Sequence, residues 1–133
     1  MIFDHIGIIV KNIDKAVEIL VDDHNLKRCG NKVVETEIDV ILQFLVDDKG
    51  LRYEIIEPSN SSSPLNKVLE SKNTNKIHHI AYLVEDIDQK CDHFREKGYG
   101  FLTKYFAAKV FNGARVIFLM SPLGFILELI EKK

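Results

Sequence analysis

The sequence predicts an α+β fold built from two tandem copies of a βαβββ module. The first observation is an internal repeat, because FDHIGIIVKNID at residues 3–14 returns as IHHIAYLVEDID at residues 77–88. The second is a change of hydrophobic period within each copy, from a short apolar run to apolar positions at helical spacing. The third is that short β-rich runs, separated by turn residues, follow each helix. Together these patterns indicate a duplicated module with one helix and four strands.

A single shift of 74 positions aligns both ends of the two copies. It places His5 on His79 near the start of the copies and Glu54 on Glu128 near their ends. Further identical pairs include Ile6/Ile80, Val10/Val84, Ile13/Ile87, Asp14/Asp88, Gly50/Gly124, Ile56/Ile130 and Glu57/Glu131. We therefore expect one domain at 1–133, with module 1 at about 1–58, a linker at 59–76 and module 2 at about 77–133.

The first module opens with an apolar, β-branched strand at 3–10. Asn12 is the predicted N-cap of the helix that follows, whose apolar positions fall on one face. A turn is expected at 28–30 and strands at 33–37, 40–46 and 51–57. Gly50 completes the hairpin turn DDKG because glycine adopts positive φ readily, and Pro58 ends the last strand because it donates no hydrogen bond.

The second module repeats this order after the polar stretch SNSSSP and a short helix expected at 65–71. A strand is expected at 77–84, followed by a helix that Asp86 caps and Gly98 stops. Further strands are expected at 100–106, 115–120 and 125–130.

The composition excludes several classes of protein. With 46% hydrophobic and 29% charged residues, the chain is typical of a globular domain. A net charge of -2 gives no basic face for nucleic acid, and no apolar run reaches the ~20 residues of a membrane span. The first residues lack the basic region of a secretion signal, and two cysteines are too few for a disulfide framework. We therefore expect a cytoplasmic protein with reduced thiols and no nucleic-acid or membrane partner.

The repeat also places chemistry-bearing residues in otherwise apolar strands. Each module has a histidine on its first strand and a glutamate on its last, namely His5 with Glu54 and His79 with Glu128. If the modules are related by a pseudo-twofold, these side chains converge on one surface. Two imidazoles and two carboxylates suit one divalent metal, Ni, Co, Zn, Mn or Fe, and the residues do not choose among these ions.

Three other histidines and two other glutamates compete for this site. His78 is next to His79, but the repeat aligns it with Asp4, and neighbouring strand residues point to opposite faces. His24 and His93 have charged neighbours and are expected to face solvent. Glu57 and Glu131 also recur at the offset, and we expect them to be the outward partners of the metal-ligating pairs.

These residues give the chain a resemblance to the vicinal oxygen chelate superfamily, which includes glyoxalase I, methylmalonyl-CoA epimerase, extradiol dioxygenases and drug-resistance proteins. DHIGIIVKNIDKA resembles the family's opening βα unit, and GFILELIE resembles its closing strand. The stretch EIIEPSNSSSPLNKVLESKNTNKIHHIAYLVEDI is similar to methylmalonyl-CoA epimerases and short clostridial glyoxalase I-like proteins. The resemblance implies an open half-barrel sheet around a metal, held by His5, Glu54, His79 and Glu128.

The resemblance further implies an enzyme that abstracts a proton alpha to a carbonyl or thioester, as an epimerase does. The alternatives are glyoxalase I-type isomerisation of a hemithioacetal, and a metal-free binding or drug-resistance module. Glu128 and Glu37 are the candidate bases, with Glu35 one register step from Glu37. Members of the family are often dimers, so a homodimer is expected. Substrate-binding residues are not identified by the resemblance.

Overall fold

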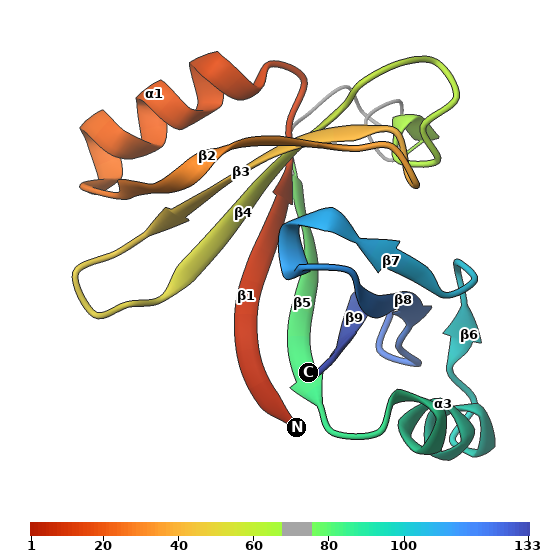
Figure 1. Cartoon of the computed structure of the whole chain (residues 1–133). Coiled ribbons are helices and arrows are strands. Elements are labelled where there is room, and N and C mark those ends of the chain that lie inside the picture. The colour runs from red at the N-terminus through yellow and green to blue at the C-terminus, as the bar shows by residue number, and fades with distance from the viewer. Residues whose placement is uncertain (68–75) are drawn as a thin grey trace. The chain divides into compact units, whose positions relative to one another are not determined.

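The computed structural model describes residues 1–67 and 76–133 and confirms an α+β fold with two tandem βαβββ modules (Figure 1). The chain divides into two compact units, which we describe separately. The N-terminal unit is His5–Ile77, and the C-terminal unit is Met1–Asp4 together with His78–Lys133.

In its described residues, the N-terminal unit has four strands paired in one sheet and a helix between the first two of them. Its elements are β1 (Ile2–Ile9, whose first residues belong to the other unit), α1 (Ile13–His24), β2 (Lys27–Glu35), β3 (Val40–Val46) and β4 (Arg52–Pro58). The strand order is β2-β3-β4-β1, in which β1 pairs with β4 in parallel and the other neighbours are antiparallel. The helix supplies the crossover that a parallel neighbour requires.

One face of this sheet packs on α1. The buried side chains of the cluster are Val10, Ile13, Val17, Leu26, Leu45 and Ile55. Because strand residues alternate between faces, Glu54 and Ile56 lie on the face opposite to Ile55 and away from α1. Helix α1 thus packs on one face of the sheet, and Glu54, which the repeat identifies as a candidate ligand, lies on the opposite face.

The C-terminal unit repeats this arrangement. Its elements are β5 (Lys76–Val84), α3 (Ile87–Glu96), β6 (Gly100–Phe101), β7 (Phe106–Ala108), the 3₁₀ turn η1 (Lys109–Phe111), β8 (Ala114–Met120) and β9 (Ile126–Glu131). The order is β5-β9-β8-β6, with β7 also paired to β8, and β5 runs parallel to β9. Helix α3 packs through Ile87, Cys91 and Phe94 on the face that carries Leu127 and Leu129.

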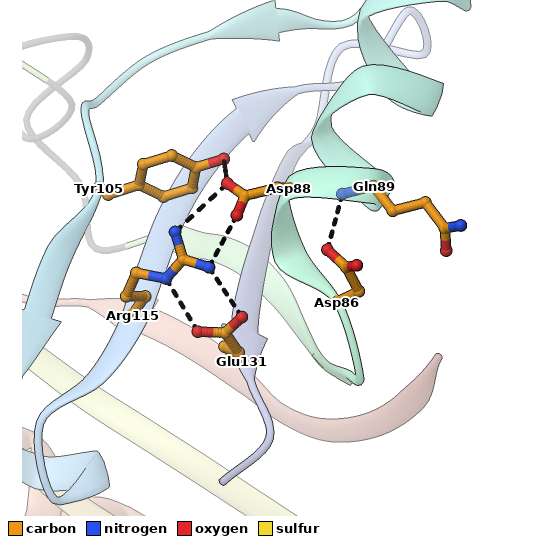
Figure 2. Close-up of polar contacts among 6 residues, drawn as sticks. All are labelled: Asp86, Asp88, Gln89, Tyr105, Arg115 and Glu131. Carbon is orange, nitrogen blue, oxygen red and sulfur yellow. Dashed lines mark hydrogen bonds and ion pairs between the residues drawn. The ribbon is translucent and has the colours of Figure 1, made fainter.

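Both helices begin with the same set of contacts. The carboxamide of Asn12 accepts a hydrogen bond from Lys15 N at 3.0 Å, and the carboxylate of Asp86 accepts one from Gln89 N at 2.9 Å (Figure 2). Glu57 on β4 accepts a hydrogen bond from Ile13 N at 3.1 Å. Its repeat partner Glu131 bonds to the backbone of the first residue of α3. Glu57 and Glu131 therefore bond to the helix starts, a role that their prediction as outward-facing residues does not include.

The structure corrects two strand predictions. Residues 28–30, expected as a turn, lie within β2, where a register shift between Cys29 and Val33 marks a bulge. Gly30 there has φ of 78°, and Gln43 Nε2 donates to its carbonyl oxygen at 2.8 Å. A bulge inserts extra residues without ending the strand, which explains why glycine was misleading. The predicted strand 100–106 is split into β6 and β7.

The helix predicted at 65–71 falls mostly outside the described residues; Asn66 and Lys67 are helical. Within the described parts of the chain, none of the helices combines the length and apolar character that a membrane crossing needs.

Candidate functional site

The N-terminal unit brings His5 and Glu54 together. In the parallel pairing of β1 with β4, His5 lies opposite Arg52 and Gly7 opposite Glu54, so both side chains leave the same face of the sheet. His5 Nε2 is 3.6 Å from Glu54 Oε1. The two residues are 0% and 3% exposed. Gly7, which lies opposite Glu54, places no side chain between the imidazole of His5 and the carboxylate of Glu54.

The C-terminal unit brings His79 and Glu128 together in the same way. Strands β5 and β9 pair Ala81 with Glu128, and His79 lies two residues earlier on the same face. His79 Nε2 is 2.9 Å from Glu128 Oε2, and the residues are 1% and 3% exposed. Each unit therefore holds one buried imidazole beside one buried carboxylate, in the pairs that the repeat predicts.

A phenylalanine supports the histidine of each pair. The rings of His5 and Phe44 meet edge-on with centroids 5.1 Å apart, and those of His79 and Phe118 do so at 5.2 Å. Phe44 lies opposite Glu54, and Phe118 lies opposite Glu128, in the neighbouring antiparallel strands. These two phenylalanines are also 74 residues apart, so the repeat offset could have identified them.

His78 is closer to the site than its place in the sequence suggested. Its ring is 7% exposed, and its Nδ1 is 2.8 Å from Nδ1 of His79. His78 thus contacts the ring nitrogen of His79 that does not face Glu128. His24 and His93 are exposed, as expected.

The two acidic residues at the end of β2 have different surroundings. Glu37 is exposed in the turn after the strand, whereas Glu35 is the last residue of β2 and is 3% exposed. Across the sheet, Glu35 on β2 lies opposite Val40 on β3, and Val40 lies opposite Pro58 on β4. Glu54 is four residues before Pro58 on β4. Because alternate residues share a face, Glu35 lies on the same sheet face as Glu54, and the structure does not bring Glu37 to that face.

Arg52 is a cation on this face that the sequence analysis missed. Arg52 is half-buried, and its guanidinium carbon lies 4.2 Å from the centroid of the Phe44 ring. A guanidinium at this distance is attracted to the ring face. An arginine in a strand gives no sequence signal of this stacking, because it depends on the β3–β4 register.

Three cations of the second module, Lys104, Lys109 and Arg115, have different surroundings from Arg52. Lys104 and Lys109 are exposed. Arg115 bonds Glu131 at 2.8 and 2.9 Å and Asp88 at 2.9 and 3.2 Å, while the hydroxyl of Tyr105 donates to Asp88 at 2.8 Å (Figure 2). The hydrogen bonds from Arg115 lower the pKa of both carboxyls, and burial raises the pKa of the Tyr105 hydroxyl. This arginine connects β8 to β9 and to the start of α3.

The donor atoms of the two pairs are suited to a metal. Each of His5, Glu54, His79 and Glu128 is buried and offers one nitrogen or oxygen ligand atom. Imidazole and carboxylate ligands bind Zn and other first-row divalent ions. A buried carboxylate is costly unless a cation or hydrogen bonds compensate it. The chemistry of the donor set therefore fits a divalent metal.

Comparisons with known proteins agree with this architecture. A model described as the glyoxalase/bleomycin resistance protein/dioxygenase superfamily matches residues 4–118. No curated protein matches the sequence. Among solved structures, a hypothetical protein from Bacillus halodurans C-125 is 30% identical, with a TM-score of 0.83 over 98% of this chain and 94% of that one.

Two methylmalonyl-CoA epimerases are also similar in structure. The epimerase of Streptomyces coelicolor, in complex with 2-nitronate-propionyl-CoA, is 26% identical with a TM-score of 0.80, covering 99% of this chain and 97% of that one. The epimerase of Mycobacterium tuberculosis is 22% identical with a TM-score of 0.82, covering 98% and 87%. At that lower identity the likeness concerns the fold alone.

Proposed function

Because the chain belongs to the glyoxalase/bleomycin resistance protein/dioxygenase superfamily, we propose that it is a metal-dependent isomerase that abstracts a proton alpha to a carbonyl or thioester, as methylmalonyl-CoA epimerase does. The observation that carries this proposal is the duplicated buried His–Glu pair, 3.6 Å apart in one module and 2.9 Å in the other. The solved epimerases at 25% and 26% identity, in complexes with methylmalonyl-CoA and an analogue, support the thioester as substrate class.

In this proposal, His5, Glu54, His79 and Glu128 hold one divalent metal. A bound divalent cation supplies Lewis-acid stabilisation of negative charge that develops on a carbonyl oxygen. Histidine Nε2 is the expected ligand atom of both imidazoles, since these nitrogens face the carboxylates. Two carboxylates and two neutral imidazoles compensate both charges of the ion.

The proton is moved by carboxylates of this chain. Glu35 is our first candidate, because it is buried on the face that carries His5 and Glu54, and it takes this role in place of the exposed Glu37. It accepts the alpha proton as the C–H electron pair becomes the C=C bond of the enolate. Return of a proton to the opposite face of that carbon inverts its configuration. Glu128 is the second candidate for one of these two transfers, provided that its carboxylate leaves the metal.

Glyoxalase I-type isomerisation remains the alternative within the same class. One observation favours it: position 54 is glutamate, and the family resemblance implies glutamate there more often in glyoxalase I proteins than in epimerases. Proton return to the neighbouring carbon of an enediolate, rather than to the same carbon, would give this reaction. Assaying a methylmalonyl thioester and a hemithioacetal in parallel separates the two activities.

The first experiment is metal stoichiometry of tag-free protein, before and after chelation and reloading with Ni, Co, Zn, Mn or Fe. We expect about one metal per chain, lost in His79→Ala and in Glu128→Ala. At 100 times its Kd the metal should stabilise the fold by about 2.7 kcal/mol, measured as a rise in Tm. An absence of binding under every loading would reject the isomerase and favour a metal-free binding module. The dimeric state and the cytoplasmic location remain predictions.

A further inference from the structure

His78 is buried beside a proposed ligand but has no role in the proton transfers above. Its ring and that of His79 have centroids 5.0 Å apart and planes at 86°, with the Nδ1 atoms 2.8 Å from one another. A neutral imidazole has one donor and one acceptor nitrogen. Two ring nitrogens at hydrogen-bond distance have one proton between them, which one nitrogen donates and the other accepts. The tautomer of one ring therefore fixes the tautomer of the other.

The ring of His79 is contacted on three sides. Nδ1 faces His78, Nε2 lies 2.9 Å from Glu128 Oε2, and the edge-on ring of Phe118 lies 5.2 Å away. Phe118 also contacts the His78 ring, with centroids 6.0 Å apart. Rotation of His79 about its side-chain bonds would break contacts at both nitrogens. The imidazole is thus held in one orientation before any ligand arrives.

We propose that His78 is a positioning residue that directs Nε2 of His79 toward Glu128 and the metal. The inference rests on the proposed function, because it assumes that His79 is a ligand. A neutral histidine that binds through Nε2 carries its proton on Nδ1. That Nδ1–H donates to Nδ1 of His78, whose own proton is then on Nε2. Such contacts to the second ring nitrogen orient metal-binding histidines and raise their basicity.

The two modules differ at this position. The residue 74 places before His78 is Asp4, so the adjacent histidine exists only in the second module. The His79–Glu128 distance is also shorter than the His5–Glu54 distance, at 2.9 against 3.6 Å. The second module therefore holds its imidazole and carboxylate closer together and adds a second imidazole beside them.

The test compares three variants of the full chain. His78→Phe keeps a ring of similar volume beside Phe118 but removes both nitrogens. His78→Asn restores a hydrogen-bonding group near the position of Nδ1. His24→Phe removes an exposed histidine from α1 and controls for nonspecific metal binding. Zn²⁺ affinity is measured by competition with a chelator, and urea unfolding verifies that each variant is folded.

We expect Zn²⁺ affinity to fall by about 10- to 100-fold in His78→Phe, as for other residues that support a metal ligand. His78→Asn should recover most of this loss, and His24→Phe should match the wild type. Nitrogen-15 NMR of the Zn²⁺-loaded wild type should show a proton on Nδ1 of His79 and on Nε2 of His78. Two results would overturn the positioning role of His78 and leave the metal site itself intact. They are wild-type Zn²⁺ affinity in His78→Phe, and a proton on Nε2 of His79 with one on Nδ1 of His78. Absence of Zn²⁺ binding by the wild type would overturn the metal site itself.

Discussion

The imidazole of His5 meets the ring of Phe44 edge-on at 5.1 Å, and His79 meets Phe118 in the same way at 5.2 Å. The duplication therefore extends beyond the His–Glu pairs to the aromatic residue that supports each imidazole. Replacing either phenylalanine with leucine keeps an apolar side chain but removes the ring edge. We expect each change to cost about 1–2 kcal/mol of stability and to weaken metal binding several-fold.

This prediction can be checked by urea unfolding and by metal competition on Phe44→Leu and Phe118→Leu. Phe94→Leu is the matched control, because Phe94 on α3 packs on the sheet face that carries Leu127 and Leu129, opposite to the face of Glu128. It should lower stability by a similar amount and leave metal affinity unchanged. Equal losses of metal affinity in all three variants would mean that general loosening, rather than ligand support, is responsible.

The second prediction separates the two acidic residues at the end of β2. Glu35→Gln keeps the shape of a buried side chain but removes its ability to accept a proton, so alpha-proton exchange should slow by about 10²- to 10⁴-fold. Glu37→Gln changes an exposed turn residue and should leave the rate unchanged. Solvent deuterium uptake into a methylmalonyl thioester measures the step directly. A slow Glu37→Gln beside a normal Glu35→Gln would return the assignment to Glu37.

The repeat offset explains how much of the site could be predicted from the sequence. It paired His5 with Glu54 and His79 with Glu128, and it distinguished His79 from His78, because residues at equivalent positions of a duplicated module have equivalent neighbours. It could not reveal that His78 contacts His79, since the first module has Asp4 at that position. Strand alternation predicts that His78 and His79 leave the strand on opposite faces. It did not predict their contact, because it describes only the direction in which each side chain leaves the backbone.

The strands that were predicted well are those with a strong pattern. Val40–Val46 was predicted with its observed bounds, because an apolar segment interrupted only at Gln43 ends at a clear turn. β2 was predicted poorly because it is largely exposed and contains a bulge at Gly30, so neither burial nor alternation marks it. Its end decides whether Glu35 or Glu37 is the strand residue on the sheet face that carries Glu54. The uncertainty about the base thus came from the element with the weakest hydrophobic signal.

A third prediction concerns the helix starts that fix β1 to α1 and β5 to α3. Asn12→Ala and Asp86→Ala each remove a side-chain acceptor for a backbone N–H in the first turn. Each should lower the free energy of unfolding by about 1 kcal/mol. Asn12→Asp keeps an acceptor and should be close to wild type. The measurement is the urea midpoint, and a wild-type midpoint for both alanine variants would show that water replaces these caps at no cost.

The last prediction is a pH dependence that arises from Arg115. Its hydrogen bonds to Asp88 and Glu131 lower the pKa of both carboxyls below their ordinary values of 3.8 and 4.5. A carboxyl whose pKa is lower in the folded state contributes stability above its unfolded pKa and loses that contribution as the pH falls through the folded one. Arg115→Gln should therefore be less stable than wild type near neutral pH, and the difference should shrink below about pH 4.

The matched control for this experiment is Arg95→Gln, because Arg95 forms an ion pair with Asp92 at 2.8 Å in which both side chains are largely exposed. Such a pair is screened by water and salt, so its removal should change little at any pH. In Arg115→Gln, NMR titration should also show the pKa values of Asp88 and Glu131 rising, since both carboxylates lose the hydrogen bonds from the guanidinium that lower these pKa values. A stability difference that stays constant down to pH 2 would mean that Arg115 acts through its packing, including its contact with the Tyr105 ring, rather than through its charge.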